Sequence, residues 1–196
     1  MALRPDKICL FVLALVPFAW LLFGLFNGSL GPNPVETLTH ETGDWALRIL
    51  LISLAITPLR RVFRLNRLIA YRRMLGLFAF FYAVLHFSIY LVFDHYFDLN
   101  TIIEDIIKRP YITVGFAAFL ILIPLAATSW TALQSRMGKR WIRLHQTVYA
   151  AAILAVIHFL WLVKADITEP AIYGGVLALL LGVRVYYFYR RRSRKR

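Results

Sequence analysis

Cysteine is almost absent from this chain, which has only Cys9 among its 196 residues. A single cysteine excludes an intramolecular disulfide framework and any cysteine-rich zinc or iron–sulfur site. The sequence also has no glycine-rich phosphate-binding loop and no internal repeat. Acidic residues are scarce, with ten Asp and Glu against 23 Lys and Arg. The result is a formal net charge of +13, and the positions of the charges decide what that excess means.

Apolar residues dominate the composition. They make up 60% of the chain, and the mean hydropathy is +0.66. A soluble domain is nearer half apolar, so we expect the lipid bilayer to be the solvent of this chain. No small-residue cleavage site follows the first apolar run, because residues 20–26 stay largely bulky and apolar. We therefore interpret that run as a retained membrane anchor rather than a cleaved signal peptide.

Six apolar stretches approach the length of about 20 residues that a helix needs to cross a bilayer. They predict an all-α, polytopic membrane protein with six transmembrane helices, in which residues 1–196 form a single domain. The second stretch is short, and we interpret Arg48 near its start as a snorkelling arginine. Pro17 and Pro124 lie within spans, where a kink is tolerated if neighbouring groups satisfy the freed carbonyls. The predicted spans are residues 8–26, 45–59, 74–93, 111–130, 144–163 and 171–189.

The segments that connect these spans alternate in charge. The N-terminus and segments 59–73, 131–143 and 190–196 hold 18 of the 23 Lys and Arg residues. The other three segments, 27–44, 94–110 and 164–170, hold three, namely Lys108, Arg109 and Lys164, together with nine of the ten acidic residues. Basic loops stay on the cytoplasmic side of a membrane. The pattern therefore predicts that both termini are cytoplasmic.

The charged segments have two interpretations each. The basic residues of 60–73 and 136–143 are either topology signals or a cationic face that receives a flavin phosphate, a reductase partner or membrane lipid headgroups. The acidic residues of segment 94–110 are either complements of this pattern or a docking surface; they are Asp94, Asp98, Glu104 and Asp105. Nucleic acid is not expected as a partner, since no recognition fold is present.

Two histidines, His86 and His158, lie deep inside separate apolar stretches. An ionisable ring in hydrocarbon is expensive and usually has a function and a partner. His86 lies 13 residues beyond Arg73, and His158 lies 15 residues beyond Arg143, on spans that run in the same direction. Histidines at matched depth on separate helices can ligate the iron of one b-type haem from its two faces. The alternative is that each ring only hydrogen-bonds a carbonyl between helices.

A second site is expected nearer the cytoplasm. His145 precedes His158 by 13 residues, or roughly 20 Å along a helix, which suits a second stacked haem. Thirteen residues leave the two side chains about 140° apart on a regular helix, so the fifth span must be distorted, for instance by a π-bulge. The matching position on the third span is Arg72, which cannot ligate iron but can pair with a haem propionate or a flavin phosphate. Alternatively, His145 is an interfacial residue beside Trp141, and Arg72 is one more arginine of the positive-inside pattern.

The remaining histidines, His40 and His95, fall in the outer segments and are expected to be solvated. No Asp or Glu lies in the middle of a predicted span, which disfavours a proton or metal-ion transporter with a histidine relay. Haem held within the membrane indicates an electron-transfer protein. The nearer alternative is a stand-alone transmembrane reductase of ferric or cupric chelates.

Several motifs carry a resemblance to a known family. They are Arg-Arg-Met-Leu-Gly-Leu at 72–77, Tyr-Ala-Val-Leu-His at 82–86, Lys-Arg-Pro-Tyr-Ile-Thr-Val-Gly at 108–115, Thr-Ser-Trp at 128–130 and Trp-Ile-Arg-Leu-His-Gln at 141–146, followed by His158. With these motifs the whole chain resembles the ferric reductase-like transmembrane domain family. Within it, the chain is most similar to the haem-binding membrane subunits of methionine sulfoxide reductase systems.

The resemblance implies a subunit of the bacterial inner membrane that is not itself the catalyst. Electrons would come from the quinone pool or a cytoplasmic flavin reductase and pass to a periplasmic molybdopterin-dependent methionine sulfoxide reductase, which repairs oxidised proteins. The family is associated with haem b and FMN. His86, His145 and His158 match its haem-associated histidines. The wider family typically shows four histidines on two helices, and Arg72 occupies the fourth place here.

Overall fold

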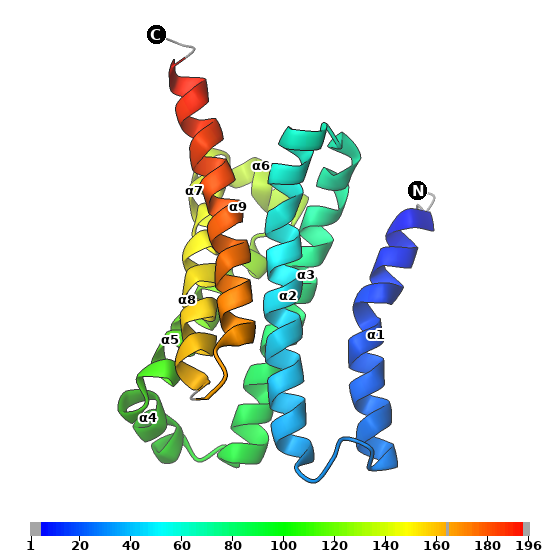
Figure 1. Cartoon of the computed structure of the whole chain (residues 1–196), viewed down its shortest axis with the longest axis vertical. Coiled ribbons are helices and arrows are strands. Elements are labelled where there is room, and N and C mark those ends of the chain that lie inside the picture. Colours follow the sequence, from blue (N-terminus) through cyan, green and yellow to red (C-terminus); the bar gives the residue numbers. More distant parts are fainter. Residues whose placement is uncertain (1–4, 164, 194–196) are drawn as a thin grey trace.

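A computed structural model describes residues 5–163 and 165–193 as an elongated bundle of helices (Figure 1). No β-strand occurs among these residues, which confirms the all-α prediction. Lys164 and residues 1–4 and 194–196, which contribute to the charge pattern, lie outside the described residues. The helices are α1 (Pro5–Asn27), α2 (Pro34–Phe63), α3 (Ile69–Ile89), α4 (Leu99–Lys108), α5 (Pro110–Ala127), α6 (Thr131–Met137), α7 (Lys139–Gln146), α8 (Val148–Leu162) and α9 (Thr168–Ser193), with short turns η1 (Asn66–Leu68) and η2 (Tyr90–Asp94).

Five segments of the described chain are long and apolar enough to cross a membrane, so this is a multi-pass membrane protein. They are Pro5–Asn27, Asn66–Asp94, Pro110–Ala127, Lys139–Leu162 and Thr168–Arg190. The helix α2 is not among them. It is long enough, at 30 residues, but Asp44 and Arg48 lie in its first half, with Arg48 near the middle, and Arg60 and Arg61 lie in its last turn. The stretch without charge between Arg48 and Arg60 is shorter than a bilayer crossing needs.

The helix α2 starts at Pro34 rather than at residue 45, because the chain supplies a cap there. The Asn33 side chain accepts a hydrogen bond from the Glu36 amide at 3.3 Å, and Pro34 fills the first helical turn without needing a donor. Arg48 therefore lies well inside the helix. It pairs with Asp44 at 3.0 Å and donates to the Tyr173 hydroxyl of α9 at 2.7 Å. Its guanidinium is thus held between α2 and α9, and the interpretation of Arg48 as a snorkelling arginine stays a prediction.

The basic segments lie at one end of the bundle. The start of α1, the turn between α2 and α3, the helices α6 and α7, and the end of α9 are all at the top of Figure 1. The α1–α2 connection and α4 are at the opposite end. Segment 94–110 is not an open loop, because most of it forms α4. The structure thus separates basic from acidic segments along the bundle axis.

Two of the long apolar segments are interrupted where they matter for the site. The segment Asn66–Asp94 ends in the π-helical turn η2 after Ile89. The segment Lys139–Leu162 is divided into α7 and α8 at Thr147, whose amide donates to the Leu144 carbonyl at 3.0 Å in a tight turn. The distortion expected between His145 and His158 is therefore present, as a break rather than a π-bulge.

The helix α1 is joined to the bundle by Tyr82 of α3, which is fully buried. Its hydroxyl accepts a hydrogen bond from the Phe18 amide at 3.1 Å and donates to the Ala14 carbonyl at 2.8 Å. These two groups would otherwise pair with each other within α1, beside Pro17, which has no amide hydrogen to donate. The tyrosine thus satisfies backbone groups next to the proline, as burial in an apolar environment requires.

Replacing Tyr82 with phenylalanine should lower the free energy of unfolding by about 1–3 kcal/mol, because buried backbone groups of α1 lose their bridging partner. Titration of the detergent-purified protein with sodium dodecyl sulfate, followed by circular dichroism, measures the change. The exposed Tyr186 of α9 provides the control, and Tyr186→Phe should leave the midpoint unchanged. Equal midpoints for the two variants would contradict the bridging role.

Candidate functional site

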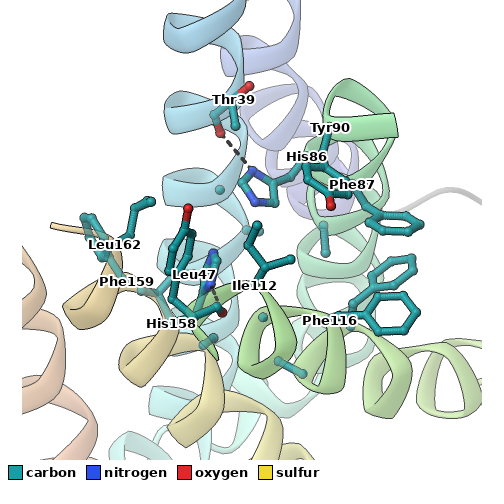
Figure 2. A pocket seen from close by; sticks show the side chains of 18 of the residues that line it. Thr39, Leu47, His86, Phe87, Tyr90, Ile112, Phe116, His158, Phe159 and Leu162 are labelled. Carbon is teal, nitrogen blue, oxygen red and sulfur yellow. Dashed lines mark hydrogen bonds between the residues drawn. The ribbon is translucent and has the colours of Figure 1, made fainter. Parts of the chain in front are cut away.

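His86 and His158 line one cavity in the half of the bundle that contains α4. The cavity has a volume of about 630 Å3, within the range of cofactor pockets, and its walls come mainly from α2, α3, α5 and α8. Figure 2 shows both imidazole rings pointing into it from opposite sides. The matched depth expected from the sequence therefore brings the two rings together.

The orientation of each ring is set by a backbone carbonyl. Nδ1 of His86 donates to the Thr39 carbonyl of α2 at 2.9 Å, and Nδ1 of His158 donates to the Tyr111 carbonyl of α5 at 2.7 Å. A carbonyl oxygen only accepts, so each Nδ1 carries the hydrogen and each Nε2 keeps its lone pair. Such a bond is the usual support for a metal-ligating histidine.

The separation of the rings matches the width of a metal ion between them. Their centroids are 6.2 Å apart, and the ring planes are at 77° to each other. Two imidazoles on opposite sides of one metal, with metal–nitrogen bonds of about 2 Å and about 1.1 Å from nitrogen to centroid, would place their centroids roughly 6 Å apart. The described residues contain no group of three or more His, Cys, Asp or Glu that could hold a metal. The pair therefore suits a metal whose other ligands come from a cofactor.

Two glycines allow the rings to sit where they do. A Cβ atom at Gly115 of α5 would lie 2.7 Å from Nδ1 of His158, and one at Gly43 of α2 would lie 3.1 Å from Nδ1 of His86. The first distance is impossible without displacing the ring, and the second is tight. Each imidazole thus packs directly against the backbone of a neighbouring helix. Only glycine permits this at residue 115.

The walls between the histidines are apolar and aromatic. Phe87 of α3 contacts Phe116 and Phe119 of α5, with centroids 5.6 and 4.8 Å apart, and Leu47 and Ile112 face the same space. Figure 2 shows Leu47, Phe87, Ile112 and Phe116 around the two imidazoles. An apolar, aromatic lining between two imidazole nitrogens with free lone pairs fits a broad, flat, largely apolar ring system that carries a metal, such as a metalloporphyrin.

The outer rim of the cavity is polar, and Asp105 of α4 is at its centre. Its carboxylate accepts from the Tyr90 hydroxyl at 3.3 Å, contacts Nε2 of His95 at 3.2 Å and pairs with Arg109 at 2.7 Å. The Arg109 side chain also donates to the Tyr111 hydroxyl at 3.3 Å. This bond, and then the charge of Asp105, raises the pKa of Arg109, so the guanidinium stays charged.

The two outer histidines differ. His40 is exposed, as expected, at the edge of the cavity. His95 was expected to be solvated, and that prediction was wrong: its side chain is only 13% exposed because the ring packs on Tyr90 and pairs with Asp105. Asp44, assigned to a loop by the sequence, lies in α2 and lines the cavity. Asp105 likewise faces the cavity rather than an outer docking surface.

His145 and Arg72 lie away from this cavity, towards the other end of the bundle. The His145 ring stacks on Trp141 with centroids 4.0 Å apart, and its Nε2 is 3.0 Å from the Thr128 hydroxyl. The positive charge of Arg72 is close enough to interact electrostatically with both His145 and Arg184 of α9. Arg184 has a buried Nε with no hydrogen-bond partner among the described residues. Arg72 and His145 therefore share this end of the bundle, and their roles at a second site stay predictions.

Several residues of the site had no clear signal in the sequence. Thr39 and Tyr111 act through their carbonyls, which any residue has. Asp105 was visible only as an acidic residue of an outer segment. Gly115 ends the motif at 108–115, so that motif marked its segment without indicating what the glycine does.

Comparison with known proteins adds a family match. The model of the ferric reductase like transmembrane component matches residues 42–156, which include Gly43, His86, Gly115 and His145. Three similar proteins each carry the name protein-methionine-sulfoxide reductase heme-binding subunit MsrQ. The protein of Herminiimonas arsenicoxydans is 51% identical, over 96% of this chain and 88% of its own length.

The other two relatives show the same extent of similarity. The protein of Rhodospirillum rubrum is 48% identical, over 96% of this chain and 91% of its own length. That of Xanthomonas axonopodis pv. citri is 51% identical, over 88% of this chain and 82% of its own length. The similarity to these relatives thus covers more of the chain than the family model does.

Proposed function

The chain belongs to the ferric reductase-like transmembrane family, as a member of the MsrQ group of haem-binding subunits, and on this premise we propose that His86 and His158 ligate the iron of a b haem. The observation that carries the proposal is the pair of bare Nε2 atoms on rings 6.2 Å apart in one cavity. The haem would supply a one-electron carrier inside the membrane.

The protein's own residues hold and protect this carrier. The carbonyls of Thr39 and Tyr111 keep both rings in the tautomer that offers Nε2. Phe87 and its aromatic neighbours exclude water, and Gly43 and Gly115 let the ligands pack closely. None of these groups performs bond-making chemistry on a substrate. The chain is therefore an electron-transfer subunit, and reduction of methionine sulfoxide takes place on a partner.

The direction of transfer follows from the charge pattern. We place six spans in the inner membrane, with α2 as the sixth and both termini in the cytoplasm, because the basic segments share one end of the bundle. The cavity then lies in the periplasmic half. Electrons enter from quinol or a cytoplasmic flavin reductase and leave to a periplasmic molybdopterin-dependent methionine sulfoxide reductase. Residues 1–196 form one domain.

A second redox group would lie nearer the cytoplasm. Arg72 interacts electrostatically with His145 and with Arg184, and the Arg184 guanidinium lies over the Tyr149 ring at 5.2 Å. Such a cluster suits an anionic group, either the propionate of a second haem with His145 as a ligand or the phosphate of FMN. Arg72 would bind this group through its guanidinium rather than through the metal.

A pyridine haemochrome assay on the detergent-purified chain tests the proposal directly. At least one b haem per chain is expected, which quinol or reduced flavin should reduce and the sulfoxide reductase partner should reoxidise. A colourless protein would contradict the proposal and favour the histidine-relay transporter. Reduction of ferric chelates by the chain alone, at the rate seen with the partner, would instead favour the stand-alone metal reductase.

A further inference from the structure

The outer mouth of the cavity carries one strong cation. Arg109, at the junction of α4 and α5, is the only Lys or Arg that lines the cavity among the described residues. The other charged residues at this rim are Asp44, Asp94 and Asp105, besides the histidines His40 and His95. A carboxylate that reached the rim would be repelled by the aspartates and attracted to Arg109.

Arg109 is also connected to the proposed iron ligand. Tyr111 accepts a hydrogen bond from Nδ1 of His158 at its carbonyl and one from Nη1 of Arg109 at its hydroxyl. Asp105 holds Nε of the same guanidinium at 2.7 Å. Nη2 makes no hydrogen bond to any described residue, so one donor edge is left for another acceptor. The Arg109 side chain is 57% exposed, at the boundary between the apolar cavity and water.

From this arrangement we propose that Arg109 anchors a carboxylate arm of the porphyrin, with Asp105 and Tyr111 as the residues that position its guanidinium. The inference rests on the proposed haem site. It adds the residue that would hold the edge of the porphyrin nearest the cavity mouth. A porphyrin buried among Phe87 and Phe116 must place its propionates where they can be solvated or paired, because an unpaired carboxylate in an apolar site is strongly unfavourable. The rim beside Arg109 satisfies both conditions.

The test compares haem with its dimethyl ester, in which the carboxylates are blocked. The apoprotein in detergent is reconstituted with each, and the release of each to excess apomyoglobin is timed. In the parent protein the free acid should be released about tenfold or more slowly than the ester, the effect of a charge-assisted hydrogen bond. In Arg109→Gln the two should be released at equal rates, whereas Arg109→Lys should keep part of the difference.

Lys108→Gln is the matched control. It removes the same charge at the adjacent residue, but Lys108 pairs with Glu104 and does not line the cavity. The haem midpoint potential should fall in Arg109→Gln, because a nearby positive charge favours the reduced iron, and should stay at the parent value in Lys108→Gln.

The results separate this inference from the proposed function. Parent-like discrimination against the ester in Arg109→Gln, with a b-haem spectrum intact, would overturn the anchor and leave the histidine ligation standing. Equal potentials in Arg109→Gln and Lys108→Gln would overturn it as well. A parent protein that takes up neither haem nor its ester would overturn both proposals.

Discussion

Alanine in place of His86 or His158 should abolish or shift the contribution of the proposed haem to the reduced-minus-oxidised b-haem spectrum of the purified protein. Loss of a supporting group around a metal ligand typically weakens metal binding about 10–100-fold, and loss of the ligand itself should exceed that range. No other nitrogen could replace the removed ligand, because the cavity walls near the two imidazoles are apolar and the other lining histidines, His40 and His95, lie at the rim. Absorption spectra and haem content per chain measure the effect.

His40→Ala is the control for this experiment. His40 lines the same cavity but is exposed at its edge, so its removal should leave the spectrum and the haem content unchanged. His145→Ala should also keep the spectrum of the outer haem, because His145 lies outside this cavity. An unchanged spectrum in both His86→Ala and His158→Ala would exclude these histidines as ligands.

The second large effect, on haem content, is expected when one methyl group is added at residue 115. Alanine at residue 115 would place its Cβ 2.7 Å from Nδ1 of His158, and the ring cannot retreat without breaking its hydrogen bond to the Tyr111 carbonyl. Gly115→Ala should therefore displace the ligand and reduce haem content nearly as much as His158→Ala. Gly43→Ala should have a smaller effect, because its contact with His86 is 3.1 Å and a small shift relieves it.

Gly182 of α9 provides the comparison, since a Cβ atom there would meet nothing within 4 Å. Gly182→Ala should keep the full haem content, and its better helix propensity should raise stability by up to about 1 kcal/mol. Spectra and thermal unfolding of the three variants distinguish these outcomes. Full haem content in Gly115→Ala would show that the ring does not occupy this position in the holoprotein.

The sequence predicted the main path of the chain well, and its errors have a common cause. Spans one and four to six agree with helices or helix pairs to within a few residues, because long apolar runs are recognisable locally. The helix α2 begins at Pro34, well before the predicted second span, because the apolar run that marks this span starts only after Asp44. In the structure Asp44 and Arg48 pair with each other, and Arg48 also bonds Tyr173, whose position no local pattern indicates.

The same distinction holds for the site. His86 and His158 were recognisable because a histidine in an apolar run is costly and matched depth can be counted along a helix. His95 and Asp105 were misjudged because their burial depends on how α4 folds back over the cavity. From the sequence, segment 94–110 is only a connection between two spans, and side chains in such a connection are expected to be solvated.

The order of residues alone determined which segments enter lipid, how their ends are charged and which two imidazoles share a depth. These properties depend on composition and on distance along one helix, and both can be counted in the sequence. Tertiary structure decided the tautomer of both histidines, the gap between their rings and the position of Arg109. Each depends on groups from other segments, such as the Thr39 and Tyr111 carbonyls, both 47 residues from their histidines. Only the packing of α2 against α3 and of α5 against α8 brings them within hydrogen-bonding distance.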